Sequence, residues 1–141
     1  MAKAILAVIL GVILGMVVNG GLIQVGTTII PAPEGVDPMD VESIRANIDR
    51  YEPKHWMIPL LAHALGTLVG ASIAAFVAPF RKMGFALGMG IFFLAGGIAA
   101  SMMIPAPTWF IAVDLVCCYI PMGWLGGRLF TPKEPSGDDP S

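Results

Sequence analysis

The sequence contains few charged residues, and this shortage already indicates its class. Charged side chains make up 13% of the 141 residues, whereas ordinary soluble domains contain about 25%. Hydrophobic residues make up 56% of the chain, and its mean hydropathy is +0.79. The net charge of −2 does not bear on nucleic-acid binding, but the lack of a basic patch argues against nucleic acid as a partner. The length predicts one domain, and the composition predicts an integral membrane protein that contacts the lipid bilayer.

Residues that commonly form metal sites are also scarce, with two cysteines and two histidines in the chain. Cys117 and Cys118 are adjacent, and neighbouring helical side chains point to different faces, so they are unsuited to an ordinary disulfide. The sequence has no C-x-x-C or H-x-x-x-H motif, so we expect no bound metal and no other cofactor. An alternative is a copper site that combines a histidine and Asp114 with these cysteines and the sulfur atoms of Met102 and Met103.

Long apolar runs, in contrast, are plentiful and occupy residues 4–24, 57–79, 85–104 and 109–129. Each run is close to the roughly 20 residues with which a helix crosses a ~30 Å hydrocarbon core. A helix also satisfies its own backbone hydrogen bonds there. We therefore expect an all-α integral membrane domain over residues 1–130, with four transmembrane helices in an antiparallel bundle. The first run follows Lys3 as in a signal peptide, but it is long and no A-x-A-like site follows, so we expect it to be retained.

The basic residues predict the orientation of these helices. With four crossings, one side of the membrane receives Lys3, Arg81, Lys82, Arg128 and Lys133. The opposite side receives residues 25–56, which carry six acids and three bases. Short loops rich in Lys and Arg remain in the cytoplasm, so we expect both termini to be cytoplasmic, in a bacterial inner membrane. The tail at residues 131–141 is polar and rich in proline and is expected to be disordered.

The outer loop at residues 25–56 begins with an extended, proline-rich stretch and then shows a helical pattern. Asp37 is placed as a helix N-cap and Pro38 at the first helical position. Apolar residues then recur with helical spacing until Pro53, at Val41, Ile44, Ile48 and Tyr51. We predict a short amphipathic helix over about 38–50 on the outer surface of the bundle. It serves either as a packed lid or as a gate over an outward-facing cavity.

Small residues recur at helical spacing within the apolar runs. Ridges of this kind let membrane helices approach closely, and we expect helix contacts at Gly11, Gly15, Gly70, Gly88 and Gly97. Pro121 has a different effect, because it deprives the carbonyl group of Cys117 of its helical partner. We therefore expect the fourth helix to be kinked at this point, with space beside the kink.

One polar residue from each run is predicted to lie at a similar depth. At 1.5 Å per helical residue, His63 lies about 9 Å from the outer end, Asp114 and Asn19 about 8 Å, and Ser101 about 5 Å. Thr67 lies one turn deeper than His63 on the same ridge. An unpaired acid at the helix centre costs about 2.5–3.5 kcal/mol. We therefore expect Asp114 to pair with His63, with the other polar side chains near enough to complete the hydrogen bonding.

This polar layer has several interpretations. It can be a clasp that fixes the register of the helices, or a protonatable His63–Asp114 pair that lines a water-accessible cavity. A Ser101–His63–Asp114 nucleophilic site is a further alternative, which requires the hydroxyl group to reach the imidazole. Tyr119 is a further candidate proton donor. No motif supports catalysis, so we assign no catalytic residue and do not expect an enzyme.

The expected function is transport or conduction of a small solute or of protons by a homo-oligomer. The alternative is a non-catalytic accessory or structural subunit that associates with other membrane subunits in a larger complex. A membrane-embedded enzyme or metal-binding protein is the third possibility. A transporter needs water to reach His63 and Asp114, whereas an accessory subunit needs only a glycine-lined face for its partner.

Overall fold

The computed structural model describes residues 1–131, and every regular element in this range is a helix. In chain order the elements are α1 (Ala2–Ile29), α2 (Val41–Ala46), the 3-10 helix η1 (Ile48–Arg50), α3 (Pro53–Val77), α4 (Lys82–Met103), α5 (Thr108–Cys117) and α6 (Ile120–Phe130). Four segments are long and apolar enough to cross a membrane, namely α1, α3, α4 and the continuous stretch of α5 and α6. The predicted all-α fold class is confirmed. The tail for which disorder was predicted lies, from residue 132 on, outside the described residues.

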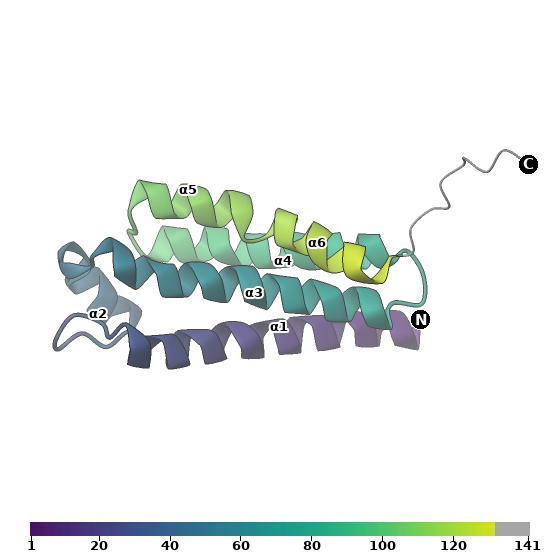
Figure 1. Cartoon of the computed structure of the whole chain (residues 1–141), viewed down its shortest axis with the longest axis horizontal. Coiled ribbons are helices and arrows are strands. Elements are labelled where there is room, and N and C mark those ends of the chain that lie inside the picture. The colour runs from purple at the N-terminus through teal and green to yellow at the C-terminus, as the bar shows by residue number, and fades with distance from the viewer. Residues whose placement is uncertain (132–141) are drawn as a thin grey trace, which may run out of the picture.

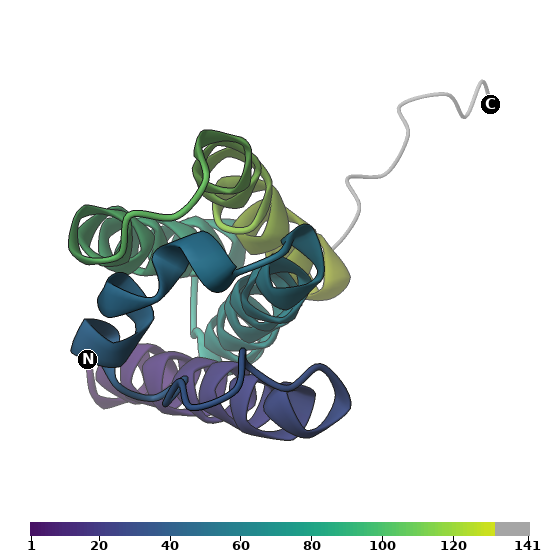
Figure 2. The same ribbon diagram turned by 90° about the vertical axis from the view of Figure 1, so that its left-hand side faces the viewer.

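The four long segments lie side by side, and α2 lies at the end opposite the N-terminus (Figure 1). Helix α3 contacts all the other long segments, whereas α1 packs mainly against α3. Figure 2 looks onto the end that carries α2. Residues 78–81 link α3 to α4, and residues 104–107 link α4 to α5 at the other end of the molecule. The segment with α2 and η1 therefore lies over one end of the helices.

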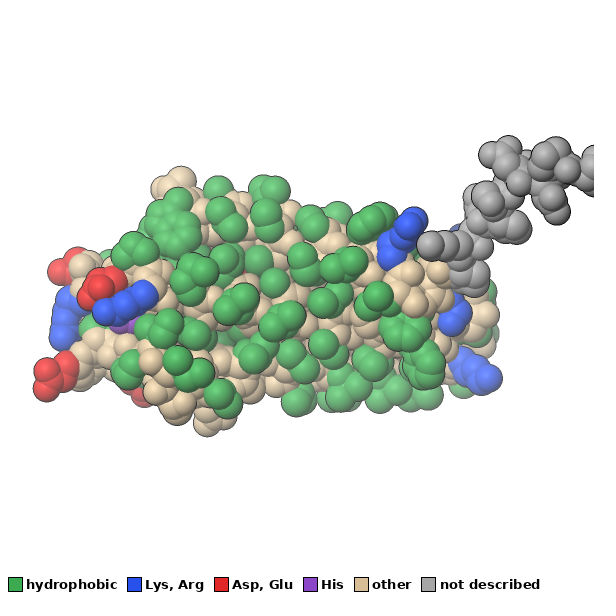
Figure 3. Space-filling model, viewed as in Figure 1, with side chains coloured by type: hydrophobic (Ala, Val, Ile, Leu, Met, Phe, Trp, Pro, Cys, Tyr) green, Lys and Arg blue, Asp and Glu red, His purple; other side chains and the backbone are tan. Residues whose placement is uncertain are grey.

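The side-chain types divide along the length of the molecule. Hydrophobic side chains cover the middle of the face in Figure 3, whereas Lys and Arg gather at both ends and Asp and Glu at the end that carries α2. Large apolar residues are exposed on every long segment, among them Ile5, Val17, Phe76, Phe92 and Val116. Monomeric soluble proteins rarely expose continuous apolar surface of this extent.

The ends of the first two helices differ from the predicted boundaries. Helix α1 reaches Ile29, five residues beyond the predicted end, and the hydroxyl groups of Thr27 and Thr28 donate to backbone carbonyls of its preceding turn. Asp40, and not Asp37, caps α2, since its Oδ1 accepts from the Glu42 amide at 3.1 Å. Asp37 instead accepts from the Met39 amide at 2.8 Å and forms a turn before the helix. The predicted helix at 38–50 is thus shorter and divided into α2 and η1.

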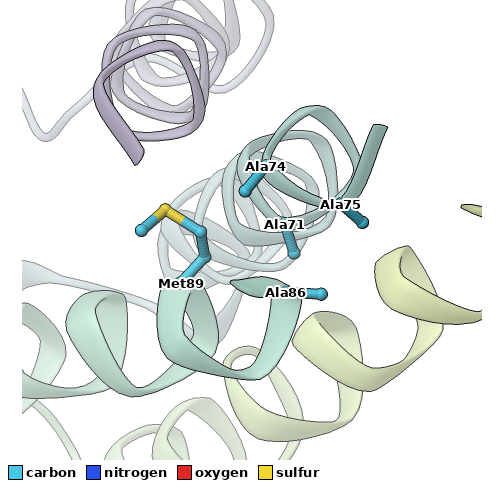
Figure 4. Packing of buried hydrophobic residues seen from close by; sticks show 5 residues of the cluster. All are labelled: Ala71, Ala74, Ala75, Ala86 and Met89. Carbon is cyan, nitrogen blue, oxygen red and sulfur yellow. The ribbon is translucent and has the colours of Figure 1, made fainter. Parts of the chain in front are cut away.

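The core is built mainly from alanine, and glycine allows the helix backbones to approach. Figure 4 shows the central cluster on α3 and α4, formed by Ala71, Ala74, Ala75, Ala86 and Met89. A Cβ atom added to Gly11 of α1 would lie 2.8 Å from the carbonyl oxygen of Gly70 on α3. One added to Gly15 would lie 2.6 Å from Cζ of Phe93 and 2.9 Å from the Gly66 oxygen. The α1–α3 contact therefore has no room for a side chain at these positions.

Gly88 was predicted at a helix contact, but it contacts no other helix within residues 1–131. Gly88 is exposed, and a Cβ atom added to it would meet nothing within 4 Å. Helix α4 instead turns the face with Gly90 and Gly97 inward, and both are buried. Gly90 faces the backbone of Tyr119, whose oxygen would lie 3.0 Å from an added Cβ atom. The small residues of α4 thus lie on two faces, of which only one packs against other helices of the described residues.

The fourth long segment is interrupted, where the sequence predicted a kink. Helix α5 closes with a 3.0 Å bond from the Cys118 amide to the backbone carbonyl of Asp114, and α6 begins with a 2.7 Å bond from the Gly123 amide to the backbone carbonyl of Tyr119. Pro121 lies in the first turn of α6. It has no N–H group to offer the Cys117 carbonyl, which explains the interruption at this place. The break lies just below Asp114 and positions Tyr119.

Candidate functional site

Asp114 is the centre of a hydrogen-bonded group that joins three chain segments. Its Oδ1 lies 2.8 Å from Nδ1 of His63 on α3. Its Oδ2 accepts a 2.9 Å hydrogen bond from the hydroxyl group of Tyr119, at the break between α5 and α6. Asp114 is 4% exposed and Tyr119 is 3% exposed. Both carboxylate oxygens therefore have a partner, as a buried acid requires.

Two local features place Tyr119 beside the acid. On a continuous helix, residues five positions apart point about 140° away from each other, so only the break lets Tyr119 reach Asp114. Gly97 of α4 provides the space for the phenol ring, because an added Cβ atom would lie 2.5 Å from Cζ of Tyr119. Gly97 thus accommodates a side chain and not a second helix backbone.

From the sequence, Tyr119 was expected only as a candidate proton donor, and its hydrogen bond to Asp114 was not predicted. The spacing of the two residues is not a helical one, so periodicity gives no signal for the pair. The signal that was present is Pro121, two residues after the tyrosine, which interrupts the helix. If Pro121 is taken to end one helix and begin another, Tyr119 lies outside regular helix and its side chain can approach Asp114.

The other predicted members of the polar layer lie apart from this group. The Ser101 hydroxyl donates to the Ile98 oxygen of its own helix at 2.7 Å, so it does not serve His63 as a nucleophile would. Asn19 packs against Gly66, where an added Cβ atom would lie 2.9 Å from the asparagine Cβ. Thr67 is buried, and its hydroxyl group has no hydrogen-bond partner among residues 1–131. The structure therefore joins only two members of the predicted layer, His63 and Asp114.

A cavity of about 190 Å³ lies above the pair, toward the end that carries α2. Its walls come from α1, α3, α4, α5 and the loop segment that includes α2. The walls are mainly apolar, with isoleucines at Ile23, Ile30, Ile44, Ile58, Ile104 and Ile111. On α3 and α5, the lining residues farthest from the α2 end are His63 and Asp114. The pair thus forms the inner end of the cavity, and Ser101 lines one wall.

Two aromatic side chains at the outer part of the cavity have buried polar atoms without a partner. Within the described chain, Nε1 of Trp56 and the hydroxyl group of Tyr51 make no hydrogen bond. Trp56 is 5% exposed, and its ring lies 5.0 Å from that of Phe110 and 5.4 Å from that of Tyr51. An unsatisfied buried donor costs about 1–3 kcal/mol. Burial, and secondarily the charge of Asp37, raises the pKa of Tyr51, so this hydroxyl group remains protonated at neutral pH.

The bond between the two side chains limits the role of each ring nitrogen of His63. With Asp114 ionised, the carboxylate only accepts hydrogen bonds, so Nδ1 of His63 would donate to it. The other ring nitrogen, Nε2, is then an acceptor, and it becomes a donor when the imidazole takes up a second proton. The side chain of His63 is 20% exposed. The pair can therefore bind a polar group and exchange a proton with it.

The metal site considered from the sequence does not form among residues 1–131, where no three His, Cys, Asp or Glu side chains gather in a position to hold an ion. Cys118 is buried, and its Sγ contacts the Leu60 oxygen at 3.5 Å, whereas Cys117 is exposed. Met102 and Met103 are exposed as well. These sulfur atoms are thus not directed to a common point with His63.

No protein-family model, no curated protein and no solved structure matches this chain. A helical bundle by itself does not decide function. The residues around the cavity carry the functional conclusion.

Proposed function

We propose that the protein is an integral membrane transporter that binds a small solute in its outer cavity and exchanges protons at His63 and Asp114. Its four long apolar segments would form an antiparallel transmembrane bundle, with both termini in the cytoplasm of a bacterial cell. The lengths of the helices and the gathering of charge at both ends support this placement. The cavity would then open toward the outer side of the inner membrane, beneath the segment with α2.

The observation that carries the proposal is the 2.8 Å His63–Asp114 pair at the inner end of a cavity. Ionisable residues within a membrane are expensive and often mark the path of a solute or a proton. Histidine is suited to proton exchange because its unperturbed pKa of about 6.5 lies near neutrality. A clasp that only fixes helix register needs neither a cavity nor an imidazole whose second nitrogen makes no hydrogen bond within residues 1–131.

The packing below the pair supports a carrier and not an open pore. Gly11 and Gly15 of α1 lie against Gly70 and Gly66 of α3 so closely that a single Cβ atom would collide with the facing backbone. Passage to the opposite side therefore requires these helices to separate. A solute bound at the cavity would be released inward only after such a movement, as in an alternating-access cycle.

The proposal is tested by flux measurements in liposomes that contain the purified protein. The parent should dissipate an imposed pH gradient, and His63→Gln and Asp114→Asn should lose this flux while remaining folded, since both variants keep hydrogen-bonding capacity but remove the titrating group. Asp49→Asn is the matched control, because Asp49 is exposed and lies outside the cavity lining. A parent without proton flux under any gradient would contradict a proton-exchanging transporter.

A second candidate is a subunit that assembles with further copies or with other membrane subunits, and the outer face of α4 favours it. Gly88 and Gly96 are exposed there, and an added Cβ atom on either would meet nothing within 4 Å. Small residues on a membrane helix allow another helix to pack closely. Purification from native membranes followed by mass measurement would show the assembly. Gly88→Leu should reduce it without unfolding the chain.

A further inference from the structure

We propose that the cavity binds a neutral, largely apolar molecule of single-ring size with a hydroxyl group at one end and a hydrogen-bond acceptor at the other. The hydroxyl group would meet His63, and the acceptor would meet Trp56. This inference rests on the proposed function, because it takes the same cavity to be the solute site. It adds the chemical class of the solute.

The volume and the walls set the size and the polarity of the ligand. An apolar cavity of about 150 Å³ accommodates benzene, and this cavity has about 190 Å³ and mainly apolar walls. A single aromatic or saturated ring with short substituents therefore fills it. A larger amphiphile would have to displace the segment with α2.

The charges around the cavity favour a neutral ligand. Of the described residues that line it, none is Lys, Arg or Glu. The carboxylate of Asp114 already has both oxygens engaged, by His63 and by Tyr119. An anion would thus find no Lys or Arg but only His55 and His63, which are uncharged until they are protonated. A cation would have to compete with His63 and Tyr119 for the carboxylate.

The inner end of the cavity calls for a hydroxyl or another donor on the ligand. With Nδ1 of His63 bonded to Asp114, the second nitrogen of the ring is an acceptor. A ligand hydroxyl group that donates to it would also be placed to give up its proton. Recognition at this end and proton exchange would then use the same atom.

The outer end calls for an acceptor on the ligand. The indole N–H of Trp56 can only donate, is almost fully buried and has no partner within the described chain. The side chain of Tyr51 also lines the cavity, and its hydroxyl group is equally unpartnered within the described chain. Both polar atoms are enclosed by protein, so a ligand acceptor would reach them once these side chains turn toward the cavity. Trp56 and His63 are seven residues apart on α3, which corresponds to about 10 Å along the helix axis. A ring with substituents at opposite ends spans most of this distance.

Three probes separate these requirements: ethyl 4-hydroxybenzoate has both groups, ethyl 4-methoxybenzoate lacks the donor, and 4-propylphenol lacks the ester acceptor. Binding to the purified chain in lipid nanodiscs is measured by calorimetry. We expect the first probe to bind most tightly and each of the others about 3- to 10-fold more weakly, the effect of one net hydrogen bond. Equal affinity for all three, or tighter binding of benzoate or of benzyltrimethylammonium, would overturn the proposal.

A variant assigns the outer contact to its residue. Trp56→Phe keeps the ring that packs on Phe110 but removes the N–H group, so it should bind ethyl 4-hydroxybenzoate no more tightly than 4-propylphenol. Trp124→Phe is the matched control, because Trp124 lies on α6 and outside the cavity lining. In ¹⁵N-labelled parent protein, the probe should shift the indole N–H resonance of Trp56 downfield and leave that of Trp124 in place. An unshifted Trp56 resonance at saturating probe would exclude the contact.

The binding test is independent of the flux test. If the probe binds as expected but no flux is found, the ligand class stands and the transport proposal fails. If flux depends on His63 and Asp114 but the neutral probe does not bind, the ligand class fails and the transport proposal stands.

Discussion

The hydroxyl group of Tyr119 donates to Oδ2 of Asp114 over 2.9 Å, although Asp114 lies on α5 and Tyr119 in the junction between α5 and α6. Removing this donor leaves a buried carboxylate oxygen unpaired. Hydrogen bonds to charged groups contribute about 1.5–3 kcal/mol, so Tyr119→Phe should lower the free energy of unfolding by about this amount. Denaturation in detergent, followed by circular dichroism, measures the change. Cys117→Ala, at an exposed neighbouring position, should change stability little.

Pro121→Ala should weaken the Tyr119–Asp114 hydrogen bond by changing the backbone between α5 and α6. The alanine amide can complete a helical bond to the Cys117 carbonyl, which favours a continuous helix and draws Tyr119 away from Asp114. Its destabilising effect should therefore not add to that of Tyr119→Phe in the double variant. Additive losses in the unfolding experiment would show that the proline does not position the tyrosine.

The two faces of α4 make opposite predictions for glycine. Gly97→Ala places a methyl group within the ring of Tyr119, so it should displace the ring and cost about 1–3 kcal/mol of stability through overpacking. Gly88→Ala meets open space, and alanine favours a helix over glycine by about 1 kcal/mol. The second variant should be neutral or more stable in the same unfolding assay. The reverse order would mean that the inward face of α4 has been assigned wrongly.

Thr67 offers a test of an unpaired group. Its hydroxyl oxygen is buried without a partner in the described chain, and an unsatisfied polar atom costs about 1–3 kcal/mol. Thr67→Val replaces the hydroxyl group by a methyl group of similar shape and should raise the free energy of unfolding by about 1 kcal/mol. Thr67→Ser keeps the oxygen and removes the methyl group, so it should not stabilise the fold. A loss of stability in the valine variant would indicate that water or a ligand occupies the site.

Tyr51 predicts a dependence on high pH. Burial raises the pKa of its phenol above the usual value of about 10, so the folded state favours the protonated form. The resulting stabilisation is fully present below the unfolded value and is lost as pH rises through the folded value. In a Tyr119→Phe background, Tyr51 is the single remaining tyrosine. Its absorbance near 295 nm should appear at higher pH in the folded chain than in the denatured chain, and coincident curves would contradict the burial.

The sequence predicted the helical fold class because its signal is long and repeated. An apolar run of about 20 residues identifies a helix even when its ends are placed a few residues wrongly. The observed helices differ from the expected ones mainly at their ends. The contact between His63 and Asp114 was predicted from depth alone, because the two residues lie at similar distances from the outer ends of their helices. Depth does not state which face of a helix a residue occupies. For this reason Ser101 and Asn19, at similar depth, lie apart from the pair, and Gly88 faces outward.

The helix cap in the loop before α2 and the break between α5 and α6 could not be predicted from hydrophobic periodicity. Asp37 and Asp40 are both acids ahead of a helix, and only the local turn decides that Asp40 caps α2. Tyr119 approaches Asp114 through a non-helical geometry that exists because the chain is interrupted. The cavity arises between five elements, so no single stretch of sequence contains it.

The interruption below Asp114 also divides the fourth segment into two helices, α5 and α6, which have different surroundings. Helix α6 packs through Gly126 against α3 and through Gly123 against α4, whereas α5 borders the cavity. Tyr119 belongs to the junction but bonds to Asp114 of α5. A tilt of α6 relative to α5 would therefore change the geometry of the Tyr119–Asp114 hydrogen bond. Through this contact, a rearrangement of α6 against α3 and α4 would alter the hydrogen bonding of the acid that borders the cavity.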